Sequence, residues 1–166
     1  MEEQGNYSRI LVPLDGSELA ERILPHVEKL ARKLGATVVL LQATASAEMA
    51  LTDATSAAGI VPGAGTIPVA VPTLDPFSRA EAERRDASAY LEGVAQRLRA
   101  QGLNVEWECR TGPAAAVIVQ RAHQLGVELM ALTTHGRGGL GRLVFGSVAD
   151  KVLRTAPCPV LLVRVA

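Results

Sequence analysis

Short apolar runs separated by helical patterns limit the possible folds of this chain more than any other feature of its sequence. Four such runs, rich in Val, Ile and Leu, lie at residues 9–14, 37–41, 129–132 and 160–163. Apolar and polar residues do not alternate within them, which is typical of strands covered on both faces and therefore of a parallel sheet. The chain is thus expected to be an α/β protein.

Helical patterns lie between these runs. In the first, apolar residues recur every three or four positions up to Gly35, a typical residue to end a helix. They are Leu19, Ile23, Val27, Leu30 and Leu34. Pro25 lies inside this pattern and is expected to remove one hydrogen bond and bend the helix. A second pattern covers residues 87–98, and a third covers residues 113–125.

A fifth strand, at residues 103–109, has a different pattern. Apolar residues alternate there with Asn104, Glu106 and Glu108, which predicts a half-exposed strand at the edge of a sheet. The element order is then β-α-β-α-β-α-β-α-β, and right-handed crossovers make this a three-layer α/β/α sandwich with a Rossmann-like, doubly wound sheet. Placing the third strand at one edge favours the order 3-2-1-4-5 for the five parallel strands.

A glycine-rich segment follows the fourth strand and precedes a helix. Its five glycines fall within eleven residues; they are Gly136, Gly138, Gly139, Gly141 and Gly146. Glycines let backbone N–H groups turn inward and, with the start of the next helix, form an anion site, to which Arg137 and Arg142 add charge. We interpret the segment as a polyphosphate-binding loop. The alternative is a flexible loop in which Ser147 caps its helix and Asp150 completes a capping box.

This loop resembles the nucleotide-binding loop of the universal stress protein family, whose ATP-binding members carry G-x2-G-x9-G-[ST]. The second glycine of that pattern is Gly136 here, and the last pair is Gly146 and Ser147. Thr133 replaces the first glycine, and its Cβ disfavours a positive φ. The segments ILVPLDGSELAERIL and SVADKVLRTAPCPVLLV are also similar to the family. The resemblance covers nearly all of a single domain at residues 1–166, except the first six residues and a middle insertion.

The order 3-2-1-4-5 places a ligand crevice at the carboxyl ends of strands one and four, because their connections go to opposite faces. Asp15 follows strand one and the glycine loop follows strand four, so an acidic side chain faces a phosphate site. Asp15 can accept hydrogen bonds from ribose hydroxyls or an adenine amino group. Its alternative role is that of a helix cap for Ser17 onward, and Ser17 itself is expected to be a cap.

The family resemblance implies a wider set of nucleotide contacts. Pro13, Asp15 and the backbone of Ala43 would line the base, and Leu132 would touch the ribose. The phosphates would meet Gly136, Gly146, Ser147 and Val148, beside Thr133 and Arg137. The ligand implied is ATP or another adenine nucleotide, with Mg²⁺ or Mn²⁺ bound through the phosphates and not through side chains.

Three functions remain open at this point: an adenine-nucleotide-binding stress or signalling protein, a slow ATPase or nucleotidyl transferase, and a dimeric scaffold that binds no nucleotide. No catalytic residue is predicted. The chain lacks the GxxxxGK[ST] motif of P-loop enzymes. His135 has no evident partner that would make it a general base, and His123 falls on the third helix, at its surface or boundary.

The last strand is predicted to form a homodimer. Val160, Leu161, Leu162 and Val163 are an unbroken apolar run at a sheet edge, where exposed N–H and C=O groups need partners. Pairing with a second copy across a two-fold axis satisfies them, and the family resemblance implies the same dimer. Val163→Pro is the test suggested by the sequence. The alternative is a monomer whose edge is covered by the insertion.

Residues 44–76 fit no period and are rich in Ala, Gly, Pro and Thr. We interpret them as a flexible surface insertion between the second strand and the second helix. A flap over the ligand or an arm onto a partner subunit are the alternatives.

Composition argues against other classes of partner. Seventeen acidic residues balance seventeen basic ones and aromatics are only 3% of the chain, which disfavours nucleic-acid binding. No apolar run reaches the roughly 18 residues of a membrane span, and the polar start is not a signal peptide. Cys109 and Cys158 form no metal or redox motif and are expected to be buried thiols in a cytoplasmic protein.

Overall fold

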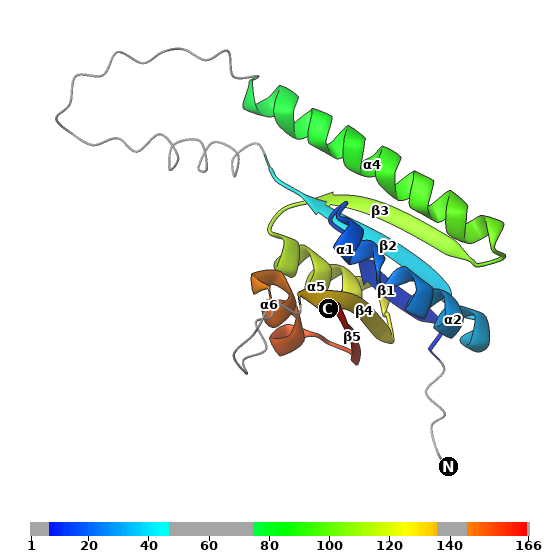
Figure 1. Ribbon diagram of the computed structural model, residues 1–166. Coiled ribbons are helices and arrows are strands. Elements are labelled where there is room, and N and C mark those ends of the chain that lie inside the picture. Colours follow the sequence, from blue (N-terminus) through cyan, green and yellow to red (C-terminus); the bar gives the residue numbers. More distant parts are fainter. Residues whose placement is uncertain (1–6, 47–74, 136–145, 166) are drawn as a thin grey trace, which may run out of the picture.

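The computed structural model describes residues 7–46, 75–135 and 146–165, which form one sheet with helices on both faces (Figure 1). The strands are β1 (Arg9–Pro13), β2 (Thr37–Thr44), β3 (Val105–Thr111), β4 (Leu129–His135) and β5 (Val160–Val165). The helices are α1 (Glu18–Glu21), α2 (Leu24–Leu34), α4 (Pro76–Ala100), α5 (Ala114–Leu125) and α6 (Ser147–Thr155).

The strands run in the order β3-β2-β1-β4-β5, and all neighbours are parallel. The predicted α/β/α sandwich with strand order 3-2-1-4-5 is therefore confirmed. Figure 1 shows α1, α2 and α4 on one face of the sheet and α5 and α6 on the other. The half-exposed edge strand predicted at residues 103–109 is β3, which begins at Val105.

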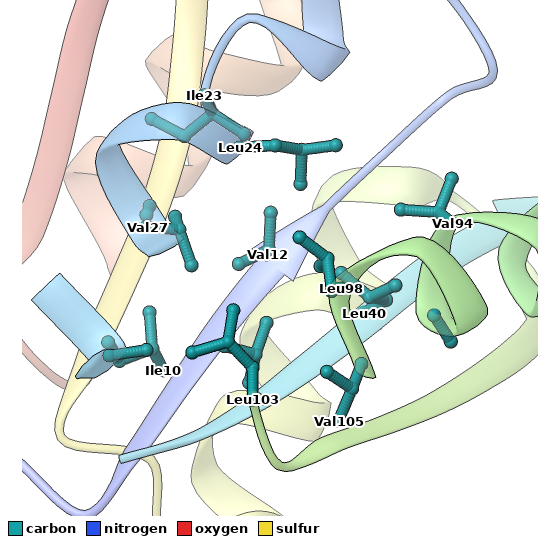
Figure 2. Packing of buried hydrophobic residues seen from close by; sticks show 14 of the residues in the cluster. Ile10, Val12, Ile23, Leu24, Val27, Leu40, Val94, Leu98, Leu103 and Val105 are labelled. Carbon is teal, nitrogen blue, oxygen red and sulfur yellow. The ribbon is translucent and has the colours of Figure 1, made fainter. Parts of the chain in front are cut away.

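Two apolar cores, one on each face, explain the unbroken apolar runs. In β1, Ile10 and Val12 face α2 and α4, whereas Leu11 between them faces α5 and α6; all three have no exposed surface. Figure 2 shows the first of these cores, with Val27 of α2 packed above β1. Burial of one aliphatic side chain stabilises the fold by roughly 1.5–3 kcal/mol, so covering both faces of a strand selects apolar residues at every position.

The first helical pattern forms two helices, and the prediction of one bent helix was wrong. α1 ends at Glu21, and α2 begins at Leu24 with Pro25 in its first turn. A proline there costs no hydrogen bond, because the first N–H groups of a helix have no partner within it. α2 ends at Gly35, which has a φ of 65° as expected for a helix-ending glycine.

α4 is much longer than predicted, because its first half lies outside the core. It begins at Pro76, and its buried residues all lie from Ala87 onward. Phe77, near its start, is 69% exposed. The apolar period that indicates a helix exists only where the helix packs on the sheet. Residues 47–74 lie outside the described residues, so the interpretation of the insertion at 44–76 stays a prediction.

The two cysteines are only half-buried, so the expectation of buried thiols was wrong. Burial nevertheless raises the pKa of the Cys158 thiol. Within the described ranges, we find no helix long and apolar enough to cross a membrane.

Candidate functional site

A cleft with a volume of about 280 Å³ lies at the carboxyl ends of β1 and β4. Eight of the ten predicted binding residues line it; they are Pro13, Asp15, Ala43, Leu132, Thr133, Gly146, Ser147 and Val148. These residues come from the ends of three strands and the start of α6. The structure thus brings them together, while their contacts with a ligand stay predictions.

Divergence of β1 from β4 opens this cleft. Among the described residues, the two strands pair only at their beginnings, through Ile10 with Leu129 and Leu11 with Met130. In contrast, β1 pairs with β2 along its whole length. Beyond Met130, the side of β4 that faces β1 is therefore free to meet a ligand.

The backbone of Thr133 faces this gap. The N–H of Met130 donates at 3.0 Å to the carbonyl of Pro159, the residue before β5, so alternate residues of β4 direct their backbone groups to β5 and to β1. Thr133 falls in the set directed to β1. It has ordinary strand geometry, because every described residue with positive φ is a glycine. The threonine that replaces the first motif glycine therefore fits the backbone without strain.

At the end of β1, Asp15 organises the turn into α1. Its Oδ1 accepts hydrogen bonds from the backbone N–H and the hydroxyl of Ser17, at 2.9 and 2.6 Å. Ser17 Oγ in turn accepts from the N–H of Ala20 at 3.1 Å, so Ser17 is the N-cap of α1, as predicted. Asp15 is thus held in place by the turn and is not itself the cap. Gly16, with a φ of 82°, supplies the left-handed backbone that this turn needs.

The start of α6 forms the opposite wall of the cleft. Gly146 is the N-cap, and no side chain of the described residues caps this helix. The alternative of a Ser147 cap with an Asp150 box was therefore wrong. The Asp150 carboxylate instead binds Arg154, at 2.9 and 3.1 Å, and these hydrogen bonds lower its pKa. The first N–H groups of α6 thus present partial positive charge to the cleft, which suits an anion.

An apolar wall completes the cleft and was not predicted from the sequence. It consists of side chains from the residue after β1 and from β2, α1 and α5: Leu14, Leu41, Leu19, Ala20, Ala114 and Ile118. Ala114 and Ile118 are four residues apart, so they share one face of α5. Their spacing indicates a helix, but nothing in it indicates that this face borders a ligand. An apolar wall beside polar groups is typical of a site for a flat heterocycle.

Other predicted groups of the site lie outside the described residues. Residues 136–145 are among them, so the contacts of Gly136 and Arg137 with phosphates stay predictions. His123 is exposed on α5, as expected for a surface residue. Within the described ranges, no group of three or more His, Cys, Asp or Glu residues could hold a metal ion.

Comparison with known proteins adds independent information. The model of the universal stress protein family matches residues 6–62 and 60–164. Universal stress protein MJ0531 of Methanocaldococcus jannaschii is 26% identical over 158 residues, which cover 95% of this chain and 82% of that protein.

Solved structures share the fold. MJ0577 superimposes with a TM-score of 0.72 at 24% identity, covering 97% of this chain and 98% of that one. A universal stress protein in complex with cAMP gives 0.63 at 20% identity, with 97% and 99% covered. One from Archaeoglobus fulgidus in complex with dAMP gives 0.58 at 22% identity, with 95% and 98% covered.

Proposed function

Because the chain belongs to the universal stress protein family, we propose that it binds an adenine nucleotide in the cleft between β1 and β4. We further propose that it acts as a cytoplasmic, dimeric binding module in stress response or signalling. In this view residues 1–166 are one domain with an insertion at 44–76.

One observation carries the proposal: the start of α6, which no side chain of the described residues caps, and Asp15 line the same cleft, which has an apolar wall. The helix start suits phosphate, the apolar wall suits a purine ring, and a carboxylate accepts from ribose hydroxyls or an amino group. The nucleotides bound to the two similar structures, cAMP and dAMP, both contain adenine, which supports this ligand class.

In the proposed complex, the base lies against Pro13 and Ala43, and the ribose lies at Leu132. The second carboxylate oxygen of Asp15 accepts from the nucleoside, because Oδ1 already binds Ser17. The phosphates lie at the N–H groups that follow Gly146, next to Gly136 and Arg137 of the glycine loop. Mg²⁺ or Mn²⁺ enters with the phosphates of ATP.

Titration calorimetry with ATP, ADP, AMP and cAMP tests this proposal. At a hundredfold excess over Kd, a bound nucleotide is expected to stabilise the protein by about 2.7 kcal/mol. For a domain of this size that raises Tm by about 5–10 °C. Absence of heat and of any Tm shift with all four nucleotides at millimolar concentration would favour the alternative of a nucleotide-free scaffold.

Hydrolysis of a bound nucleotide is expected to be far slower than about 1 s⁻¹, a low rate for an enzyme. Even a modest enzyme lowers its barrier by about 8 kcal/mol, largely through positioned charge and a general base. The described cleft presents amides and one carboxylate that already holds Ser17. A phosphate-release assay measures the rate; steady turnover near 1 s⁻¹ that Asp15→Asn or His135→Ala removes would establish an enzyme.

The dimer is proposed to form through the free edge of β5, the edge that pairs with no other strand in the described part of the chain. The N–H of Met130 bonds to Pro159, and Met130 lies opposite Val160 in the register of the two strands. By the alternation of a parallel ladder, Leu161 and Val163 direct their backbone groups to β4, whereas Val160 and Leu162 direct theirs outward. All four side chains remain partly exposed. A second copy of β5 would satisfy the outward groups and cover these side chains.

A further inference from the structure

A second cavity, of about 560 Å³, lies between the carboxyl end of β2 and the first half of α4. Figure 1 shows α4 lying along β2 and β3, on the face of the sheet opposite α5. Eight residues line the cavity, from the turn after β1, from β2 and from α4: Gly16, Gln42, Arg79, Ala82, Glu83, Asp86, Ala87 and Tyr90. It is separate from the cleft, because Gln42 points to the α4 face and Ala43 to the α5 face.

Buried polar atoms without partners gather at this cavity. Among the described residues, the buried side-chain atoms that lack a hydrogen-bond partner are Gln42 Oε1, Thr44 Oγ1 and the Tyr90 hydroxyl. Gln42 and Tyr90 line the cavity, and Thr44, which is 2% exposed, lies two residues along β2 on the same face. Burying a polar group without a hydrogen-bond partner is unfavourable, so native proteins rarely leave such groups unsatisfied. The Gln42 oxygen can only accept, so it requires a donor.

The charges around the cavity favour a cation. The carboxylates of Glu83 and Asp86 outnumber the guanidinium of Arg79. Burial, followed by the nearby carboxylates of Glu21 and Asp15, raises the pKa of Tyr90. The neutral phenol therefore offers an oxygen lone pair and an aromatic face, both of which suit an ammonium group.

We propose that this cavity is a second ligand site, distinct from the nucleotide cleft, for a small organic ammonium compound such as an alkyl diamine. One ammonium group donates to Gln42 Oε1 and the Tyr90 oxygen, beneath α4. The other lies between the carboxylates of Glu83 and Asp86, which are three residues apart on the same helix and so share one side. The Ala45 N–H holds Glu83 at this position through a hydrogen bond of 3.3 Å.

Titration calorimetry of the nucleotide-free protein with 1,4-diaminobutane tests the proposal. A Kd of about 1 mM is expected for so small a ligand. 1,4-Butanediol has the same carbon chain as the diamine but carries no charge, so it is the control compound and is expected not to bind. Equal binding of the diol, or no binding of the diamine at about 20 mM, roughly twentyfold above the expected Kd, would overturn the proposal.

Matched variants locate the site. Gln42→Leu is expected to weaken diamine binding about tenfold, because it removes the buried acceptor. Glu83→Gln is expected to weaken it about threefold, as for one exposed charge. Glu81→Gln makes the same change on the same helix, at a residue that pairs with Arg85 and does not line the cavity, and is expected to have no effect. Equal losses for Glu81→Gln and Glu83→Gln, or unchanged binding by Gln42→Leu, would place the diamine elsewhere.

A further variant tests whether the diamine binds in the second cavity and not in the nucleotide cleft. Ala43→Leu, which narrows the cleft, is expected to leave diamine affinity within about twofold of wild type, because the side chain of Ala43 packs on the α5 face and does not line the cavity. A loss of tenfold or more in this variant would mean that the diamine binds in the nucleotide cleft and that the second site is wrong.

Discussion

Leu162→Pro is expected to convert the proposed dimer into monomers while each protomer keeps its fold. The N–H of Leu162 is directed away from β4, so proline at this position removes a donor from the free edge and none from the sheet. Because the proposed dimer is two-fold symmetric, the interface loses this donor in both protomers. With about 0.5–1.5 kcal/mol for each hydrogen bond, and the steric bulk of the ring in addition, the dimer Kd is expected to rise at least about a hundredfold.

Sedimentation at micromolar concentration measures the effect, and two variants control it. Leu162→Ala loses the same side-chain packing but keeps the N–H, so it is expected to remain a dimer. Val163→Pro removes a donor directed to β4 and is expected to destabilise the protomer by about 1–3 kcal/mol. A monomeric wild-type protein, or an intact Leu162→Pro dimer, would show that the free edge of β5 is not the interface.

Ala43→Leu is expected to weaken adenine-nucleotide binding at least about a hundredfold, or about 2.7 kcal/mol. Ala43 lines the cleft at the position proposed for the base, and leucine places three more carbon atoms in a cavity of about 280 Å³. A purine that packs against Ala43 cannot share this space. The cleft is solvent-accessible, so little strain is expected in the free protein, in contrast to an overpacked core.

Calorimetry with the tightest-binding of the four nucleotides compares this variant with Ala89→Leu. Ala89 is exposed on α4 and does not line the cleft, so the same chemical change there is expected to leave the affinity unaltered. Thermal unfolding without nucleotide checks that both variants are folded. Unchanged nucleotide affinity in a folded Ala43→Leu protein would exclude the proposed position of the base.

Much of this fold could be predicted from local patterns, because burial on both faces of a strand leaves an unbroken apolar run. Residues 9–14 and 160–163 are such runs, and both are strands of the sheet. The pattern fails where a helix has no core to face, as in the first half of α4. The same pattern led to the wrong prediction that Pro25 lies inside one helix, because the apolar period continues across the break between α1 and α2.

The sequence by itself determined the order of the strands. It also determined that Asp15 and Gly146 lie at the same end of the sheet, because parallel topology brings the carboxyl ends of the strands together. Only the tertiary structure decided that no side chain of the described residues caps α6, that α5 contributes to an apolar wall, and that Gln42 lies against a second cavity. It also decided that Leu162, and not Val163, faces the free edge. Each of these depends on register and on which face of an element meets another, and such long-range contacts leave no periodic signal in the residues concerned.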